Sequence, residues 1–285
     1  KAKEIIIDKE NLFEQLRRVD IRFAKEKYTY EKLADEISNF SQILCVVNTR
    51  KDAKMLYDAM AGRNSIPVVH LSRMMCQQHI MDKIEEVRHK LNPEHPQPVI
   101  VISTQLIEAG VDIDFPVVYR AMAGLDSIAQ AAGRCNREGR LRRGKVTVFD
   151  FEDTRSRGLM RKAAQTTEEL LLMGKKDFLS PMTTKTYFES YYNKVNNMDV
   201  AEIEKTLYKE TPQFATAARQ FKLIDNEGIT VFVPYKDGTN LIEEMKRGDP
   251  SITLMRKLQR YSVSIPSYYE NKLLTLGAMK VDDFT

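Results

Sequence analysis

The hydrophobic pattern between residues 43 and 151 alternates between two kinds of segment. Short continuous apolar runs are typical of parallel strands that are buried on both faces. Such runs predict strands at Ile43–Val47, Pro67–Leu71, Val99–Ser103, Val117–Arg120 and Val146–Phe151. Between them, apolar residues recur at helical spacing. Strand and helix therefore alternate, which predicts an α/β fold: a mostly parallel sheet flanked by helices.

Capping chemistry predicts where the helices of this region begin. Thr49 and Asp52 have the spacing of a capping box, so a helix is expected directly after the first strand. Asp126 is expected to cap another helix, running from Ser127 to about Cys135. Between these two, a further helix is predicted by apolar residues at helical spacing: Ile80, Ile84, Val87 and Leu91.

After Asp150 the pattern changes to longer helical stretches. Residues 155–176 are strongly helical, and Ser180 followed by Pro181 is typical of a helix start. Two more strands are expected at Gly228–Pro234 and Tyr261–Ile265. We interpret one aromatic helical face as core packing: Tyr187, Phe188, Tyr191, Tyr192 and Val195. The sequence therefore predicts an α/β domain over residues 1–175 and a smaller α+β C-terminal domain over residues 176–285.

Composition limits the class of protein without naming a function. The chain has 285 residues, of which 42% are hydrophobic, enough for a sizeable core. Its net charge of +4 permits nucleic-acid binding but is too small to indicate it. No apolar run reaches membrane-spanning length, so no membrane partner is expected. The spacing of Cys45, Cys76 and Cys135 fits neither a metal site nor a disulfide framework, which favours a reducing, cytoplasmic location.

Polar residues follow several of the predicted strands at their carboxyl ends, where parallel sheets place their ligand sites. Asn48, Thr49 and Arg50 follow the first strand, and Arg73 follows the second. These side chains suit the phosphates of a nucleic-acid backbone. Helix capping alone would also explain Thr49.

The segment Ser103–Asp114, "STQLIEAGVDID", follows the third strand. Thr104 and Gly110 stand where a hydroxyl and backbone amides can meet phosphates. Asp112 can accept hydrogen bonds from ribose hydroxyls. Each signal is weak alone, but together they indicate a phosphate-containing ligand.

The segment 130–140, "QAAGRCNREGR", carries two arginines at helical spacing. On a helix, Gln130, Arg134 and Arg137 would share one face, and Gly133 beside them would allow a ligand to approach closely. Arginine offers a fixed fork of donors that suits phosphate oxygens. A solvated basic face is the alternative interpretation of the arginines alone.

Taken in order, "VVNTR", "STQLIEAGVDID" and "DSIAQAAGRCNREGR" resemble motifs IV, V and VI of superfamily 2 helicases. More narrowly, "EAGVDIDF" followed by "LDSIAQAAGRCNREG" resembles the CRISPR-associated helicase–nuclease family of type I interference. DEAD-box RNA helicases usually carry His-Arg before the motif VI glycine and a second glycine before the last arginine, where this chain has Gln130 and Asn136. The resemblance implies a second RecA-like domain at residues 1–175 and an accessory domain at residues 176–285.

The resemblance also implies a role for each candidate residue. Arg137 matches the arginine finger, which stabilises charge in phosphoryl transfer, and Arg134 matches the neighbouring γ-phosphate contact. The implied ATP-binding residues are Gln130, Gly133, Asp112 and Gly110. The implied DNA-binding residues are Asn48, Thr49, Arg50, Arg73 and Thr104. Members of the family move along single-stranded DNA as two RecA-like domains close around ATP, in response to a Cascade-type surveillance complex.

Neither a phosphate-binding loop nor an acidic Mg²⁺ motif is recognisable in the chain. The nearest match, Gly139–Val146, has Val146 in place of the hydroxyl residue and precedes a strand instead of following one. No His-Asp dipeptide indicates the nuclease, and the histidines lack metal-ligand spacing, so no metal site is expected. ATP and Mg²⁺ would then be bound mainly by a first RecA-like domain outside this chain. The start at Lys1, near a strand-like run Glu4–Ile7, also favours a chain that is part of a longer protein. We therefore expect this chain to be inactive as an ATPase alone.

Other functions remain open at this point. The chain could belong to another superfamily 2 translocase, of the DEAH or restriction type. It could also be a nucleic-acid-binding module without catalysis, although such a module has no need for both Arg134 and Arg137. A generic α/β domain with a basic surface is the least specific alternative.

Overall fold

The computed structural model describes residues 6, 8–63, 65–108, 110–153, 158–195, 198–221, 228–248 and 251–280. Of the strand-like run Glu4–Ile7, all but Ile6 lies outside the described residues. The chain forms two compact units, Lys1–Tyr191 and Tyr192–Thr285. This division falls later than the domain boundary predicted between residues 175 and 176. The difference arises because Tyr187, on the helix that follows residue 180, is buried with Leu125 and Leu170 of the same unit.

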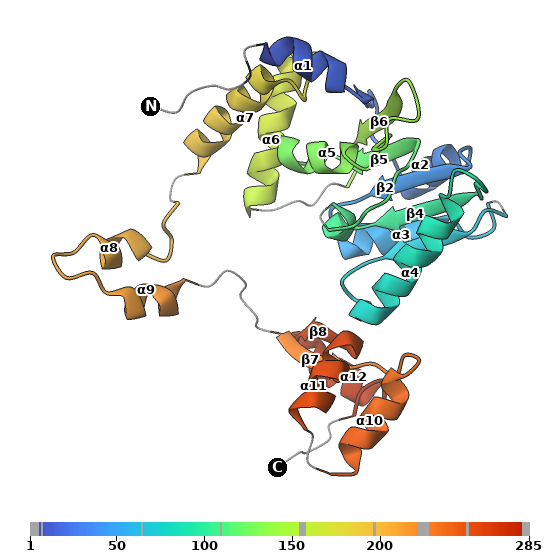
Figure 1. Ribbon diagram of the computed structural model, residues 1–285, viewed down its shortest axis with the longest axis vertical. Helices are drawn as coiled ribbons and strands as arrows, with labels where there is room; N and C mark the ends of the chain where they lie inside the picture. Colours follow the sequence, from blue (N-terminus) through green and yellow to red (C-terminus); the bar gives the residue numbers. More distant parts are fainter. Residues whose placement is uncertain are drawn as a thin grey trace. The chain divides into compact units, whose positions relative to one another are not determined.

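The first unit contains a six-stranded sheet in which every pair of neighbouring strands is parallel (Figure 1). Its strand order is β1-β6-β5-β2-β4-β3. The strands are β1 Val19–Phe23, β2 Gln42–Val46, β3 Val68–Leu71, β4 Val99–Ser103, β5 Val117–Ala121 and β6 Gly144–Phe149. The fold class and the strands predicted in residues 43–151 are therefore confirmed. Strand β1 was not predicted, because its alternating burial lacks the continuous apolar run of a central strand.

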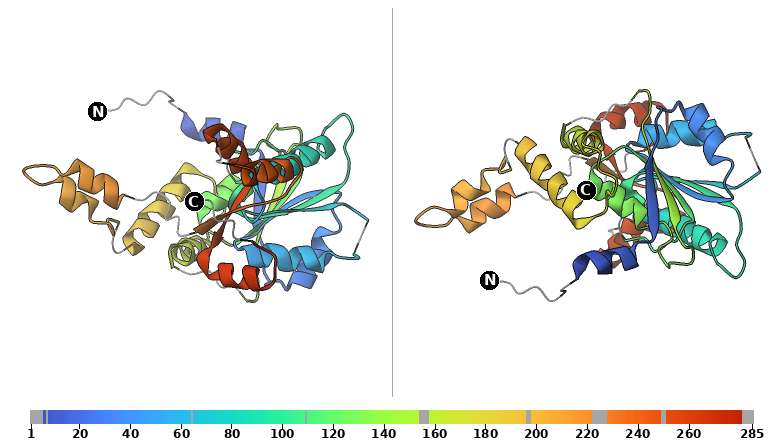
Figure 2. Two further views of the ribbon diagram at one scale, coloured as in Figure 1. Left: turned by 90° about the horizontal axis from the view of Figure 1, so that it is seen from below. Right: turned by 90° about the horizontal axis from the view of Figure 1, so that it is seen from above.

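Helices cover both faces of this sheet (Figure 2). The helices described in this unit are α1 Lys9–Leu16, α2 Tyr30–Ile37, α3 Arg50–Ala59, α4 Gln77–Lys90, α5 Leu125–Ala132, α6 Gly158–Leu172 and α7 Pro181–Lys194. Helices α4 and α5 pack in one core with Leu44 and Val46, whereas α2 and α3 pack in another with Ile43 and Cys45. The two cores follow from the strand period of two, which points successive side chains of β2 to opposite faces.

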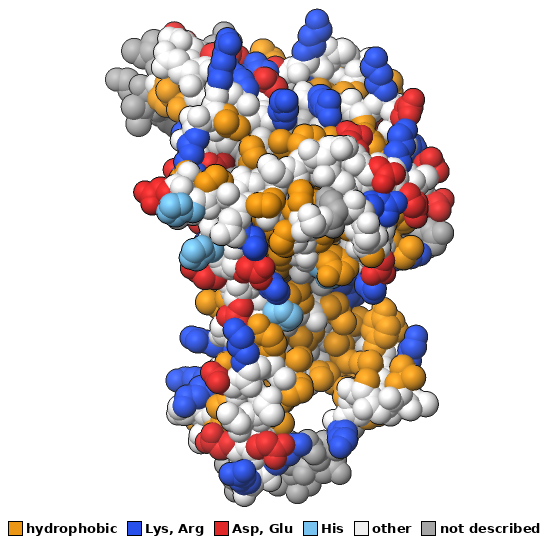
Figure 3. All heavy atoms as spheres, turned by 90° about the vertical axis from the view of Figure 1, so that its right-hand side faces the viewer, with side chains coloured by type: hydrophobic (Ala, Val, Ile, Leu, Met, Phe, Trp, Pro, Cys, Tyr) orange, Lys and Arg blue, Asp and Glu red, His pale blue; other side chains and the backbone are white. Residues whose placement is uncertain are grey.

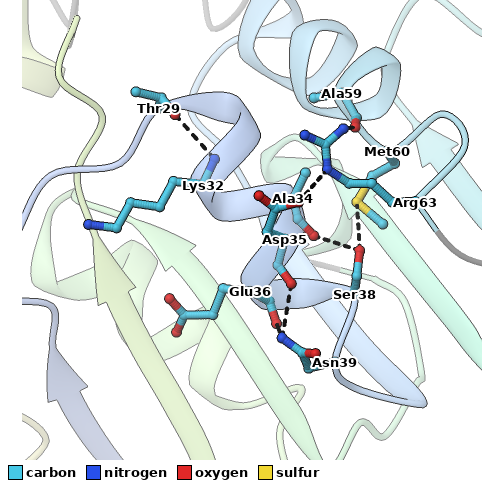
Figure 4. A network of polar contacts seen from close by, with 10 residues as sticks. All are labelled: Thr29, Lys32, Ala34, Asp35, Glu36, Ser38, Asn39, Ala59, Met60 and Arg63. Atoms are coloured by element: carbon cyan, nitrogen blue, oxygen red, sulfur yellow. Dashed lines mark hydrogen bonds and ion pairs between the residues drawn. The ribbon is translucent and has the colours of Figure 1, made fainter.

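Helices α2 and α3 are held together by polar contacts at their ends (Figure 4). At the end of α2, the Ser38 hydroxyl donates to the Ala34 carbonyl at 2.6 Å. Arg63, which follows α3, joins the two helices, with its Nε 2.7 Å from Asp35 Oδ1 of α2. At the start of α3, the Asp52 amide donates to Thr49 Oγ1 at 3.0 Å. The helix start predicted at Thr49 is thereby confirmed, with Thr49 as its N-cap.

Helix α7 begins as predicted, since the Thr183 amide donates to Ser180 Oγ at 3.2 Å. On the aromatic face of α7, Tyr187 packs in a core and is buried with Leu125, Leu170 and Phe178. Phe188 and Tyr191 pack around the same cluster, whereas Tyr192 is 51% exposed. The interpretation of the stripe as core is therefore confirmed for its first three aromatic residues.

The second unit has an antiparallel pair of strands, β7 Gly228–Phe232 and β8 Ser262–Pro266, as predicted. Its helices are α8 Ile203–Leu207, α9 Phe214–Gln220, α10 Gly238–Lys246, α11 Ile252–Leu258 and α12 Glu270–Thr275. A small core forms around Met245, Leu254 and Leu258. Across both units, none of the helices among the described residues is long and apolar enough to cross a membrane.

Candidate nucleotide and nucleic-acid sites

The residues predicted to bind DNA follow three neighbouring strands of the sheet. Strand β4 lies between β2 and β3, and its last residue, Ser103, is in register with Val46 on one side and Leu71 on the other. The three strands therefore end at one edge, and the residues that follow them form the carboxyl-edge set: Asn48, Thr49, Arg50, Arg73 and Thr104. The geometry places these residues at one edge of the sheet.

Members of the carboxyl-edge set differ in how freely they can meet a ligand. Arg73 is exposed in a turn, and exposed Arg50 places Nη1 2.7 Å from Met74 Sδ of the same turn. Thr104 is only 8% exposed. The side-chain amide of Asn48 is already hydrogen-bonded within the protein, because its Nδ2 donates to the Met122 carbonyl at 2.8 Å. Arg50 and Arg73 are thus the members best placed to contact a phosphate.

The two motif VI arginines do not lie on a helix, so the predicted shared face with Gln130 is wrong. Helix α5 ends at Ala132 with Gly133 as its C-cap, and Gln130 is exposed on the helix. The chain then turns tightly, with the Arg134 amide donating to the Ala131 carbonyl at 3.0 Å. We call residues 133–137 the arginine loop.

The predicted cap of α5 is also wrong. The N-cap is Gly124, without a side-chain hydrogen bond, and Asp126 lies within the first turn of the helix. A Cβ on Gly124 would come within 2.6 Å of the Tyr187 hydroxyl and 2.5 Å of Asp126 Oδ1. Close packing at the glycine therefore sets this helix start, which one sequence cannot reveal.

Within the arginine loop, Arg134 and Arg137 have different surroundings. Arg134 is 8% exposed, and its Nε and Nη2 donate to the carbonyls of Ile107 and Glu108 at 3.0 and 2.7 Å. Arg137 has a 40% exposed side chain whose Nε lies 2.9 Å from Asp112 Oδ1. Arg137 is thus the arginine that remains accessible to a ligand, while Arg134 holds the preceding motif in place.

A carboxylate fixes the backbone on which Arg137 stands. Asp114 Oδ1 accepts from the Arg137 amide at 2.7 Å, and Asp114 Oδ2 accepts from the Glu138 amide at 3.2 Å. Gly110, earlier in the same segment, has φ +72°, a left-handed conformation that favours glycine. The segment 110–114 and the arginine loop therefore form one structure, as expected if Asp112 and Arg137 face one ligand.

Asn136, which departs from the glycine usual in DEAD-box helicases, also adopts the left-handed region, with φ +48°. Asparagine tolerates this conformation better than other residues with a side chain. Its Nδ2 donates to the carbonyls of Arg18 and Leu141 at 2.9 and 2.8 Å, and the Leu141 amide donates to its Oδ1 at 2.9 Å. The substitution thus retains the backbone shape and adds contacts that a glycine lacks.

The arginine loop lies near the starts of strands, opposite the carboxyl-edge set. Phe115, just before β5, bridges to Cys135, and Arg18, just before β1, accepts from Asn136. The candidates therefore fall into two groups at opposite edges of the sheet. Residues 104–108 follow β4 at one edge, and residues 110–114 precede β5 at the other, so this part of the chain connects the groups.

A buried ion pair, unrecognised in the sequence, lies between these two groups. Arg120 Nε is 2.8 Å from Glu108 Oε1, with side chains 0% and 6% exposed. Burial raises the pKa of Glu108 above its usual value, and the neighbouring Arg120 opposes this shift. Two signals in the sequence point to this pair: Arg120 is a charged residue inside the apolar run Val117–Ala121, and Glu108 lies within "EAGVDIDF". Among the described residues, no group of three or more His, Cys, Asp or Glu could hold a metal.

Comparison with known proteins identifies the family to which these motifs are similar. Residues 39–140, which include β2 to β5 and the arginine loop, match the family described as "CRISPR-associated nuclease/helicase Cas3, C-terminal". The chain resembles the C-terminal part of Cas3. The resemblance predicted from the three motifs is thereby confirmed.

Curated relatives and solved structures agree with this family. A Cas3 nuclease/helicase from Methanothermobacter thermautotrophicus is 25% identical over 282 residues, covering 85% of this chain and 33% of that protein. A Haloferax volcanii Cas3 is 53% identical over 58 residues, covering 20% of this chain and 6% of that protein. The T. fusca Cas3–ADP crystal structure has a TM-score of 0.60 at 13% identity, covering 88% of this chain and 36% of that one, which supports the fold. The chain thus spans a third or less of these two curated relatives.

Proposed function

We propose that this chain supplies the second RecA-like domain and an accessory domain of an ATP-dependent helicase of the Cas3 kind. The helicase would translocate on single-stranded DNA during type I CRISPR interference, so that foreign DNA is unwound and degraded. The observation that carries the proposal is the half-exposed Arg137, paired with Asp112 and anchored by Asp114 within the matched region. An arginine held in this way suits the charge that develops on a transferred phosphoryl group.

In this proposal, each group of candidates has one ligand. Arg137 is the arginine finger, Asp112 contacts the ribose, and Gly110, Gln130, Gly133 and Arg134 shape or line the same nucleotide site. The carboxyl-edge set contacts the DNA backbone. ATP and Mg²⁺ are held mainly by a first RecA-like domain, and a nuclease domain and a Cascade-type surveillance complex complete the cytoplasmic system. These partners follow from the resemblance to Cas3.

The first test concerns ATP turnover by the chain itself. Residues 139–146 lead into β6, whereas a phosphate-binding loop leads from a strand into a helix. We therefore expect no ATP hydrolysis above background when the 285-residue chain is mixed with Mg²⁺ and single-stranded DNA, measured by phosphate release. DNA-stimulated turnover that disappears in Lys145→Ala would contradict this expectation and make Gly139–Val146 a working phosphate loop.

The second test concerns DNA binding at the carboxyl edge. Removing both exposed arginines in Arg50→Ala/Arg73→Ala should weaken binding of a fluorescent single-stranded oligonucleotide and lower the salt slope by about 1 for each lost phosphate contact. The control is Lys90→Ala/Lys145→Ala, which removes the same charge near the starts of β2 and β6. Equal losses in both variants would indicate general attraction to a basic surface.

On the face drawn in Figure 3, acidic and basic side chains are interspersed. The distribution of charge on that face therefore does not show a DNA path by itself.

A different superfamily 2 translocase is the alternative for the same site. The match of residues 39–140 to Cas3 favours the Cas3 kind. A non-catalytic binding module would retain the carboxyl-edge contacts but would have no need for Arg137, so the effect of changing Arg137 separates it from the enzyme.

A further inference from the structure

Arg120 is a fully buried arginine in a central strand that belongs to neither candidate group. Its side chain is 0% exposed in β5, and it lies beside the carboxylate of Glu108. Removing two charges from water is costly, and apolar residues of similar volume often stabilise a fold at least as well. Stability alone therefore explains these charges poorly.

On one side, Arg120 holds a residue of the carboxyl-edge set. Its Nη1 donates to Asn48 Oδ1 at 2.6 Å and to the Ala121 carbonyl at 2.9 Å. Because Asn48 Nδ2 donates to the Met122 carbonyl, both ends of the Asn48 amide are fixed. The guanidinium thereby sets the orientation of the Asn48 side chain, two residues after the end of β2.

On the other side, the partner of Arg120 holds the arginine loop. Besides the ion pair, the Glu108 carboxylate accepts from the Ser127 hydroxyl of α5 at 3.2 Å. The backbone carbonyl of Glu108 accepts from Arg134 Nη2 at 2.7 Å. Glu108 is therefore held by Arg120 through its side chain and by Arg134 through its backbone.

These contacts form a continuous series, Asn48–Arg120–Glu108–Arg134, through the interior of the first unit. We propose that Arg120 and Glu108 are positioning residues that couple the carboxyl-edge set to the arginine loop. When bound DNA shifts the segment after β2, Arg120 moves with Asn48 and shifts Glu108. Arg134, bonded to the Glu108 carbonyl, then moves the loop that contains Arg137. A buried ion pair suits this role, because neither charge can leave its partner without a large cost in solvation. The inference rests on the proposed function.

The first experiment measures coupling in the natural protein that contains this chain. The double variant Arg120→Met/Glu108→Gln removes both charges while retaining volume, so it should fold. We expect the stimulation of ATP turnover by single-stranded DNA to fall about tenfold, within the usual range of coupling between sites. Turnover without DNA and the KM for ATP should change little. Stimulation equal to that of the unaltered protein would overturn the proposal.

A stability control separates positioning from general damage. Leu33→Ala empties a buried site in the α2–α3 core, away from the series, and should lower thermal stability without reducing DNA stimulation. Glu108→Gln alone, which retains an acceptor for Arg120, should show an intermediate loss of stimulation. Loss of stimulation in Leu33→Ala to the extent seen in the double variant would reduce Arg120 to a structural residue and overturn the proposal.

The second experiment needs no ATP turnover, so its outcome is distinct from failure of the proposed function. Hydrogen exchange of the Arg137 and Glu138 amides, both bonded to Asp114, reports on the arginine loop of the 285-residue chain. Single-stranded DNA should change their exchange rates in the unaltered chain and leave them unchanged in the double variant. If DNA binds but these amides do not respond in the unaltered chain, the coupling is refuted. If DNA does not bind at all, the proposed function is refuted.

Discussion

In the natural protein that contains this chain, Arg137→Ala should lower ATP turnover by about 10³-fold, the lower end of what an arginine finger contributes. Binding of ATP should change little, because the finger acts on charge that appears only in the transition state. The accessible guanidinium beside Asp112 and the anchored backbone support this division. Steady-state kinetics together with a nucleotide-binding titration would measure the two effects separately.

The matched control for this prediction is Arg140→Ala. Arg140 lies in the same region, with its side chain 49% exposed and Nη1 3.7 Å from Asp114 Oδ2, but the resemblance gives it no role. It should leave turnover within a few-fold of the unaltered protein. Parallel losses of ATP binding and turnover in Arg137→Ala would mean that Arg137 binds the ground state, and the finger role would be wrong.

The second large effect is expected from Asn136→Ala, which should lower the free energy of unfolding of the first unit by about 2–4 kcal/mol. The left-handed backbone costs alanine roughly 1–2 kcal/mol. Loss of the three part-buried hydrogen bonds that the Asn136 side chain makes with Arg18 and Leu141 adds roughly 1–2 kcal/mol. The loss would be measured by urea unfolding, followed with a probe in the first unit.

Asn136→Gly separates the two causes. Glycine adopts the left-handed region freely, so this variant should recover the backbone part of the loss and retain the hydrogen-bond part. If alanine and glycine were equally destabilising, backbone conformation would contribute nothing at this position. If neither variant changed stability, the contacts that join Asn136 to Arg18 and Leu141 would carry no net free energy.

Continuous apolar runs predicted the sheet well because a central parallel strand must be apolar on both faces. The run Val99–Ser103 coincides with β4 residue for residue. Strand β1 was missed because an edge strand is half exposed and reads as alternating residues. Helix boundaries were predicted correctly where capping is chemical, as at Thr49, and wrongly where it is steric, as at Gly124.

Motif order identified the candidate residues, but their arrangement required the fold. The spacing of Gln130, Arg134 and Arg137 fits a helix, yet the chain turns at Gly133 because Arg134 is drawn inward to two backbone carbonyls. The pair of Arg120 and Glu108 was not foreseen, since Arg120 lies outside the three motifs and Glu108, although within "EAGVDIDF", was given no role. Buried polar contacts between distant segments leave little trace in a single sequence.

ATP turnover by the natural protein that contains this chain, measured with and without single-stranded DNA, tests the central claim most directly. We predict that single-stranded DNA stimulates turnover strongly, that duplex DNA without a single-stranded tail does not, and that Arg137→Ala abolishes the stimulated rate. A rate of ATP turnover that is the same with and without DNA would contradict the proposal that this chain belongs to a Cas3-like DNA translocase. So would a DNA-stimulated rate that is unchanged in Arg137→Ala.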